Sequence, residues 1–296
     1  MEVWARERWT VAAAAHRERV RGLTGPYRER AARGETHPVI DFLFVYYSHR
    51  PSLLERWHPG PGLVLAGAEE YLRWAGYEAT AGGVRVRPRP GGYRTARFVR
   101  ELLAATASRP PMLGCFGLHE WAMVYRQPPR EVRHGSTPLR LGPAGTDAVL
   151  ESLPVRCSHH DAFRFFTAAA RPRNALQPGR ADQVRLEQPG CLHATMDLYK
   201  WAYKLAPVTP SELVADCLEL ALATRELDMR ASPYDLSALG YEPVPIETAE
   251  GRARYAREQA GLARRAAPLR ARLIELCDTL LAHPDAAPAL AADARG

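Results

Sequence analysis

The segment CLHATMDLYKWAYKL, residues 191–205, carries the most informative pattern of ionisable side chains in the sequence. Its chemically active residues follow a 3.6-residue period and would share one face of a helix: His193, Asp197, Lys200, Trp201 and Lys204. Ionisable groups on a helix otherwise rich in aromatic and aliphatic residues are costly to bury unless the charges pair or a ligand completes them. An ion pair from Asp197 to Lys200 or Lys204 on a half-exposed helix is the competing interpretation.

The two lysines of this segment are unusual in their own right. Of the 40 basic residues in the sequence, only Lys200 and Lys204 are lysines, and every other one is an arginine. Two lysines one helical turn apart in such a chain indicate a position where arginine does not substitute. Lys200 and Lys204 are therefore candidate site residues.

A second segment, THPVIDFLFVYYSHRP, places His37 and Asp41 four residues apart, so that they would stack on one face of a helix. Tyr46 and Tyr47 follow in the same segment. A hydrogen bond at the start of the helix is the more common explanation of such a pair.

A third segment, GCFGLHEWAMVYR, places His119 and Glu120 at the start of an apolar helix. Trp121 and Tyr125 are four residues apart in it. The pair His119-Glu120 does not begin an H-E-x-x-H zinc motif, because residue 123 is a methionine.

A fourth segment, CSHHDAFRFF, places His159, His160 and Asp161 in the first turn of a helix that we expect Ser158 to cap. An acidic residue in a first turn complements the helix dipole, so capping chemistry competes here with a catalytic or ligand role.

Together these segments hold enough histidines and carboxylates for a metal site inside a helical bundle. Two His-x-x-x-Asp helices that face each other would supply the ligands His37, Asp41, His193 and Asp197. Such a centre suits a metal-dependent hydrolase or an iron oxygenase that acts on a small molecule. Lys200 argues against it, because an ammonium group on the same face repels a cation.

The elements that position these residues are mainly helical. Periodicity and capping signals predict helices over 2–33 (two, broken at Gly25-Pro26), 36–50, 63–75, 93–107, 115–126, 144–152, from 158, 191–205, 210–229 and 247–282. Residues 76–88 form the best β-hairpin candidate, around Gly82-Gly83, and 153–157 a possible strand. We expect ordered connections over 127–143 and 168–190. The fold class is therefore mainly α: a single helical domain over 1–283 with a small β-hairpin element, and a flexible C-terminal tail over 284–296.

Composition narrows the class of protein. The 296 residues are 46% hydrophobic and 25% charged, which is typical of a globular chain, and no apolar run is long enough for a membrane span. We therefore expect a soluble, cytoplasmic protein with no membrane partner and no obligate protein partner. Its five widely spaced cysteines predict neither a disulfide framework nor a cysteine-built zinc site.

The net charge of +7 permits a polyanionic partner. Arginines concentrate in two segments, six over 84–100 with no acid, and seven over 252–272 with Glu258 as the lone acid. Contact with phosphates and a solvated arginine-rich face are both consistent with this distribution. A non-catalytic nucleic-acid-binding protein does not explain why ionisable groups cluster on the aromatic helices.

Five segments between residues 37 and 255 resemble segments of a known protein family: HPVIDFLFVYYSHRP, GCFGLHEWAMVYR, CSHHDAFRFF, EQPGCLHATMDLYKWAYKL and DMRASPYDL. They resemble a family of actinobacterial proteins labelled 3-methyladenine DNA glycosylase. The resemblance implies a DNA-repair N-glycosylase that releases an alkylated purine from DNA and needs no cofactor or metal.

Such an enzyme must extrude a nucleotide, hold a cationic base against aromatic faces and stabilise an oxocarbenium-like sugar with a carboxylate. The resemblance then implies a role for each candidate. Asp197 is the preferred catalytic carboxylate because Lys200 beside it would keep it ionised, and Glu120 is the reserve. Lys200 would contact a phosphate or form a Schiff base with the sugar after base loss, and His119 and His193 are further catalytic candidates. The stacking faces would come from Tyr46, Tyr47, Trp121, Tyr125 and Trp201. Arginines 85, 87 and 89 and those of the 171–185 loop would contact DNA phosphates.

Overall fold

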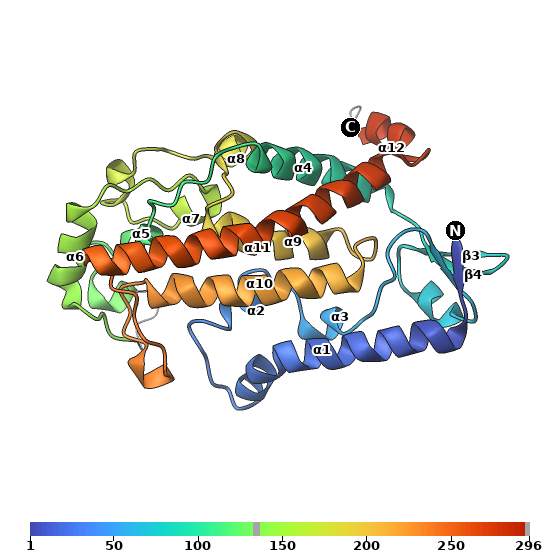
Figure 1. Ribbon diagram of the computed structural model, residues 1–296, viewed down its shortest axis with the longest axis horizontal. Helices are drawn as coiled ribbons and strands as arrows, with labels where there is room; N and C mark the ends of the chain where they lie inside the picture. Colours follow the sequence, from blue (N-terminus) through green and yellow to red (C-terminus); the bar gives the residue numbers. More distant parts are fainter. Residues whose placement is uncertain (133–136, 294–296) are drawn as a thin grey trace. The chain divides into compact units, whose positions relative to one another are not determined.

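The structure of the protein is a computed structural model that describes residues 1–132 and 137–293 (Figure 1). Helices dominate it, so the mainly α prediction is confirmed. The chain separates into two compact units, which leaves the expectation of a single domain unconfirmed. Unit 1 comprises Met1–Leu103, Leu198–Glu219 and Leu269–Gly296, and unit 2 comprises Ala104–Asp197 and Leu220–Pro268. Among the described residues, no helix combines the length and apolar character that crossing a membrane requires.

Unit 1 contains a small sheet. In the described part of the chain the sheet has four strands in the order β1 (Glu2–Trp4), β2 (Leu63–Leu65), β4 (Gly83–Val86) and β3 (Tyr77–Thr80). β1 and β2 are parallel, and the other neighbours are antiparallel. The predicted hairpin is therefore confirmed as β3–β4, and it belongs to a larger sheet than the sequence indicated.

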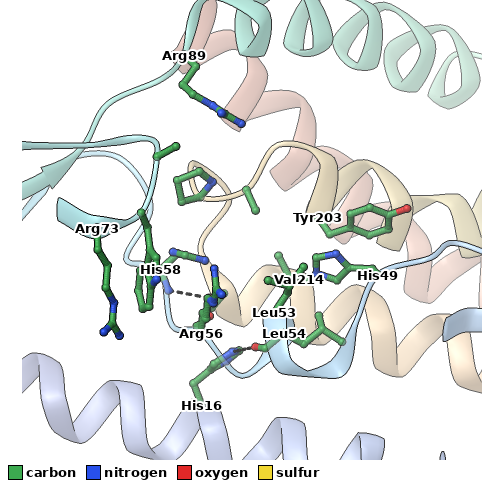
Figure 2. Close-up of a pocket in the computed structure, with 15 residues that line it drawn as sticks. His16, His49, Leu53, Leu54, Arg56, His58, Arg73, Arg89, Tyr203 and Val214 are labelled. Atoms are coloured by element: carbon green, nitrogen blue, oxygen red, sulfur yellow. Dashed lines mark hydrogen bonds between the residues drawn. The ribbon is translucent and has the colours of Figure 1, made fainter. Parts of the chain in front are cut away.

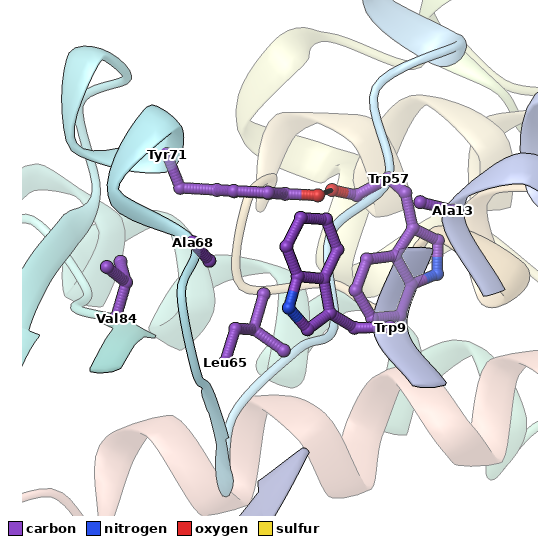
Figure 3. Close-up of a cluster of buried hydrophobic side chains, with 7 residues drawn as sticks. All are labelled: Trp9, Ala13, Trp57, Leu65, Ala68, Tyr71 and Val84. Carbon is purple, nitrogen blue, oxygen red and sulfur yellow. Dashed lines mark hydrogen bonds between the residues drawn. The ribbon is translucent and has the colours of Figure 1, made fainter. Parts of the chain in front are cut away.

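A cluster of buried side chains joins this sheet to the N-terminal helix α1 (Arg6–Ala32). Figure 3 shows Trp9 and Ala13 of α1 beside Trp57, and Leu65 and Val84 of the sheet in the same cluster. The Trp9 indole Nε1–H donates to the carbonyl of Ala66 at 3.0 Å, which satisfies its one polar atom inside an apolar cluster.

Three helix predictions in unit 1 are wrong. The helix α1 continues through Pro26 instead of breaking there, because an exposed proline removes one hydrogen bond while the buried stripe that includes Val20 and Thr24 continues to pack. The predicted helix over 36–50 shrinks to α2 (Phe42–Val45). The predicted helix over 63–75 is β2 followed by the 3-10 helix η1 (Glu69–Arg73), because pairing with β1 and β4 overrides local helical periodicity.

The other helices of unit 1 agree better with the sequence. The helix α4 (Pro90–Ala107), of which 90–103 belong to unit 1, corresponds to the predicted helix over 93–107, whereas α3 (Pro51–Leu54) was not predicted. Part of the segment expected to be a flexible tail is helical: α12 (Ala286–Asp293) forms there, and Ala286 is buried. Residues 294–296 of that segment lie outside the described residues.

Like α4, three further helices contribute residues to both units: α9 (Leu192–Lys204), α10 (Ser211–Arg230) and α11 (Ala249–Leu281). All three were predicted to within two residues of their observed ends.

Unit 2 also contains four shorter α-helices: α5 (Leu118–Ala122), α6 (Gly142–Ser152), α7 (His160–Phe163) and α8 (Gln183–Leu186). The short 3-10 helices are η2 (Pro129–Glu131), η3 (Arg171–Arg173), η4 (Arg180–Asp182) and η5 (Ser237–Leu239). The 168–190 connection is long and largely irregular, as predicted. Of the predicted 127–143 loop, residues 133–136 lie outside the described residues.

Unit 2 corrects three local predictions. Of the helix predicted over 115–126, only the short helix α5 forms. It begins after Gly117, which adopts a left-handed backbone conformation (φ 70°). His159, and not Ser158, is the N-cap residue of α7, with no side-chain cap hydrogen bond. The possible strand over 153–157 is an isolated bridge between Val155 and Asn174.

Candidate metal centre

Unit 2 brings together side chains from α5, α9 and α10. The ligand atoms of His119, His193 and Asp228 all lie within 4.8 Å of one another, and all three side chains are buried. The rings of His119 and His193 are nearly perpendicular, at 83°, with centroids 4.5 Å apart. Two atoms that bind one first-row ion at about 2.1 Å lie roughly 3.0–3.4 Å apart. The 2.9 Å between His119 Nε2 and Asp228 Oδ1 is close to this separation, whereas the bound of 4.8 Å on the whole group is wider.

The contact between His119 and Asp228 is not an ordinary hydrogen bond. His119 Nε2 and Asp228 Oδ1 are 2.9 Å apart, but neither atom has an aligned hydrogen-bond partner in the described part of the chain. A buried polar atom without a partner costs about 1–3 kcal/mol, so such atoms require an explanation. In the neutral form of His119 its lone pair and that of Asp228 would converge, an arrangement that a shared cation would satisfy. In the protonated form the two groups make a buried ion pair instead.

A second group lies beside the first. His159 Nε2 is 3.3 Å from Glu187 Oε1 and 3.5 Å from Asp197 Oδ2, and all three side chains are buried. The His159 ring centroid is 5.3 Å from that of His193, which belongs to the first group. The ligand atoms of these three residues also lie within 4.8 Å of one another. The described part of unit 2 therefore contains two adjacent groups that could each hold an ion.

Glu187 is held in place by its neighbours. The Gln183 amide Nε2 donates to Glu187 Oε1 at 3.1 Å, and Arg109 Nη1 donates to the Glu187 carbonyl at 2.8 Å. These bonds fix the position of a carboxylate that follows α8 in an irregular connection. Outer partners of this kind orient the ligands of metal sites in general.

Behind Asp228 lies a buried ion-pair network. Arg225 Nη1 donates to Asp228 Oδ2 at 2.8 Å and to Glu120 Oε1 at 2.6 Å. Burial by itself raises the pKa of Asp228, but the charges of His119 and Arg225 outweigh it and lower the pKa below its usual range. Asp228 therefore carries a negative charge and presents Oδ1 to the histidines.

The pKa values of the two histidines of the first group, His119 and His193, are shifted in opposite directions. Burial lowers the pKa of both, yet the Asp228 carboxylate raises the pKa of His119 above its ordinary value. The pKa of His193 falls well below its ordinary value, because burial and the charge of His119 both act against protonation. His193 is therefore a neutral imidazole with a lone pair, which is the form that binds metals.

A small enclosed cavity of about 20 Å³ adjoins His119 and His193. Its walls include the thiols of Cys115, Cys157 and Cys191, whose pKa values burial raises, to about 12 for Cys157. These thiols stay protonated at neutral pH. A cavity of this volume accommodates one water molecule or a diatomic molecule and no nucleobase.

The predicted ligand set is only partly brought together. His193 and Asp197 lie in the two adjacent groups of unit 2, whereas His37 and Asp41 belong to unit 1 and to neither group. The Asp41 carboxylate accepts a hydrogen bond from the backbone N–H of His37 at 2.7 Å. The His37 ring Nδ1 accepts from the backbone N–H groups of Val39 and Ile40 at 3.3 Å. The His37–Asp41 pair thus stabilises a local turn through hydrogen bonds, which was the more common explanation of its spacing.

The aromatic candidates of α5 are interior residues. Trp121 is fully buried and its Nε1–H donates to the carbonyl of Ala231 at 2.9 Å. Tyr125 is also buried, and its hydroxyl donates to Glu151 Oε1 at 2.6 Å. As placed, neither ring offers an exposed face for stacking.

The remaining aromatic candidates lie in unit 1. The carbonyl of Tyr47 accepts a hydrogen bond from the Tyr203 hydroxyl at 2.6 Å, and Tyr46 stacks on Phe42 at 4.9 Å. Trp201 is buried, with the Lys200 Nζ 4.5 Å from its ring centroid. Lys204 Nζ is 5.6 Å from the same ring.

Asp161 is placed at the start of α7, where its carboxylate lies 3.2 Å from the Arg164 Nε. His160 beside it contacts the carbonyl of Pro178 through Nδ1 at 3.1 Å. Both residues have structural partners at the surface of this helix, and neither belongs to the two buried groups.

Several arginines that were expected to contact phosphates have partners within the protein. Arg85 and Arg87 are 2.6 Å and 3.2 Å from the Glu78 carboxylate. In the 171–185 loop, Arg173 donates to the carbonyl of Glu151 and Arg185 pairs with Asp182 at 2.7 Å.

Sequence reasoning missed Asp228, Arg225 and Glu187. A signal for Asp228 was present, because it lies between Leu227 and Met229 on a helix where a charged residue at a buried position requires a partner. Glu187 gave no periodic signal, since it belongs to an irregular polar connection.

We compared the chain with models of protein families, with curated proteins and with solved structures, and found no match in any of the three comparisons.

Proposed function

We propose that this protein is a metal-dependent enzyme in which His119, His193 and Asp228 hold a divalent first-row ion. The observation that carries the proposal is the buried convergence of the three ligand atoms within 4.8 Å, with an unaligned 2.9 Å contact between two of them. Two histidines and one carboxylate form the ligand set of non-haem iron enzymes, which leaves other coordination positions open to reactants. Iron is therefore the metal that this set favours.

The surrounding residues have supporting roles in this proposal. Arg225, fixed between Asp228 and Glu120, orients the carboxylate and keeps it ionised. His159, Glu187 and Asp197 form the adjacent group, which suits a second ion or a hydrogen-bonded chain that moves protons. The 20 Å³ cavity favours water or a diatomic molecule as the species that reaches the ion.

Metal analysis of the purified protein tests this proposal. Protein prepared without chelator is expected to contain about one iron, manganese or zinc per chain, because three buried ligands on a folded scaffold bind such ions tightly. His193→Gln and Asp228→Asn are expected to lose that metal while their circular dichroism spectra stay those of a folded protein.

His160→Gln is the matched control, because His160 is adjacent in sequence to His159 but belongs to neither buried group. It should retain the metal content of the parent. A parent protein that binds no iron, manganese or zinc after purification and after reloading contradicts the proposal, as does equal metal content in all three variants.

A second candidate is the DNA N-glycosylase activity that the family resemblance implies, with DNA as the partner. The observation that favours it is the 3.5 Å contact between Asp197 Oδ2 and His159 Nε2, because a carboxylate–imidazole pair can position and deprotonate a water molecule. Release of adenine-derived base from methylated DNA by EDTA-treated protein, abolished in Asp197→Asn, would support this activity. No release by either the metal-loaded or the EDTA-treated protein would remove it.

A further inference from the structure

Unit 1 contains a half-open cavity of about 440 Å³ that is separate from the histidines of unit 2. Its walls come from α1, α3, the segment that follows η1, the end of α9 and the start of α10. Figure 2 shows His49 and Tyr203 side by side on one wall and His58 on the other side in the same view. The volume lies within the range of small-molecule sites, roughly 300–1,000 Å³.

The charged side chains that line this cavity are all positive. Arg56, Arg73 and Arg89 are among its lining residues, and no aspartate or glutamate of the described ranges 1–132 and 137–293 is. Within those ranges none of the three guanidinium groups lies within ion-pair distance, 4.0 Å, of a carboxylate. Elsewhere in unit 1 arginines do pair in this way, as Arg19 does with Asp216 at 2.9 Å.

The acidic residues nearest in sequence are already engaged. Glu55 pairs with Arg21 at 3.0 Å and also with Arg28, and Glu70 pairs with Arg6 at 3.1 Å. The guanidinium groups of Arg56 and Arg73 lie instead over the Trp74 ring, at 5.1 Å and 5.0 Å from its centroid. The positive charge at the cavity is thus not neutralised by the protein itself.

Part of the remaining wall is formed by aromatic and imidazole rings without charge. His49 stacks on Tyr203 with ring centroids 4.3 Å apart and an angle of 12° between the rings. Burial lowers the pKa of both His49 and His58 to about 4, so both rings are neutral at physiological pH. His58 is also held in place by a 2.6 Å hydrogen bond between its Nδ1 and the Tyr77 hydroxyl.

One buried polar atom at this cavity has no partner in the described part of the chain. His16 is 5% exposed, and its Nε2 is hydrogen-bonded to the carbonyl of Leu54 at 2.8 Å, as Figure 2 shows. Its Nδ1 is buried without a hydrogen bond. Since Nε2 carries the proton that the carbonyl accepts, Nδ1 is an acceptor that a donor group on a ligand would satisfy.

The three arginines are solvent-exposed, whereas His16 and Leu54 are buried. We propose that the cavity binds an aromatic anion of about mononucleotide size. Its planar ring stacks against the pair His49–Tyr203, and its phosphate or carboxylate meets the arginines. Guanidinium groups recognise both kinds of anion in a bidentate manner, and aromatic walls stack on planar rings.

Isothermal titration calorimetry with three aromatic anions tests the proposal: adenosine 5′-monophosphate, indole-3-acetate and salicylate. At least one is expected to bind with a dissociation constant below about 1 mM, and its uncharged counterpart, adenosine, indole-3-acetamide or salicylamide, at least about tenfold more weakly. Inorganic phosphate should compete with the phosphate-bearing probe.

Arg56→Gln and Arg89→Gln are expected to weaken binding of that anion by about tenfold each, since each removes one charge-assisted contact from an exposed position. The matched control is Arg33→Gln, which removes an exposed arginine of unit 1 that pairs with Glu35 and does not line the cavity. The proposal is overturned if no probe binds at 1 mM, in the range of about −4 kcal/mol, or if both cavity variants bind as tightly as the control.

Discussion

His58 shows how burial dominates the protonation of a side chain in this protein. Its ring faces Tyr77, and Arg56, His16 and His49 are the charged or titratable groups that oppose its protonation further. Burial is the largest cause, and the pKa of His58 falls from 6.5 to about 4. A histidine in this state takes up a proton more readily in the unfolded chain than in the folded one.

The consequence for stability has a definite sign. Stability from neutral His58 is fully present above about pH 6.5 and is lost as the pH falls toward 4, because the unfolded chain binds the extra proton. We expect the free energy of unfolding to fall by about 1–2 kcal/mol between pH 7 and pH 5 from this residue. His58→Asn keeps an acceptor for Tyr77 but does not titrate, so urea unfolding should show a smaller pH dependence in this variant. Identical pH dependence in the two proteins would refute the assignment.

At the scale of elements, local patterns predicted those segments whose own periodicity decides the structure. Helices α4, α6, α9, α10 and α11 carry a continuous apolar stripe or clear end signals, and the hairpin β3–β4 has a glycine pair between two alternating runs. The strand β2 was not predictable in this way, because its partners β1 and β4 lie about 60 residues before it and 20 after it in the sequence.

The hairpin depends on Gly83. The sequence alone did not show which of the two glycines, Gly82 or Gly83, the turn requires. Gly83 has φ +138°, and a Cβ atom built there would lie 2.1 Å from the carbonyl oxygen of Leu65 on β2. Gly83→Ala should therefore destabilise the protein by about 2 kcal/mol or more, measured as a lower urea midpoint. Gly82→Ala is the control, because its Cβ would meet nothing nearer than Val64 Cγ1 at 3.7 Å, and it should change stability by less than about 0.5 kcal/mol. Equal midpoints for the two variants would contradict this role.

At the scale of the whole molecule, the candidate centre shows which spatial relations a single sequence leaves undetermined. His119, His193 and Asp197 were identified because each occurs in a segment with an unusual concentration of ionisable and aromatic residues. Their grouping was not predictable, since the two groups draw on residues from 119 to 228 that only the folded chain brings together. The predicted partners His37 and Asp41 were chosen by matching spacing, and spacing describes one element without stating which other elements it meets.

Because the sequence contains two lysines, cleavage by a lysine-specific protease reports on a single helix of the protein. A protease specific for lysine finds two cleavage sites in the chain, and both lie on α9, where Lys200 is 8% exposed and Lys204 is exposed. Proteases cut locally unfolded segments, so the rate of cleavage after Lys200 measures how often this one helix opens. We expect slow cleavage of the native protein that accelerates with urea, and mass spectrometry of the fragments separates the two sites. Rapid cleavage after Lys200 without denaturant would mean that the helix carrying His193 and Asp197 opens independently of the rest of the fold.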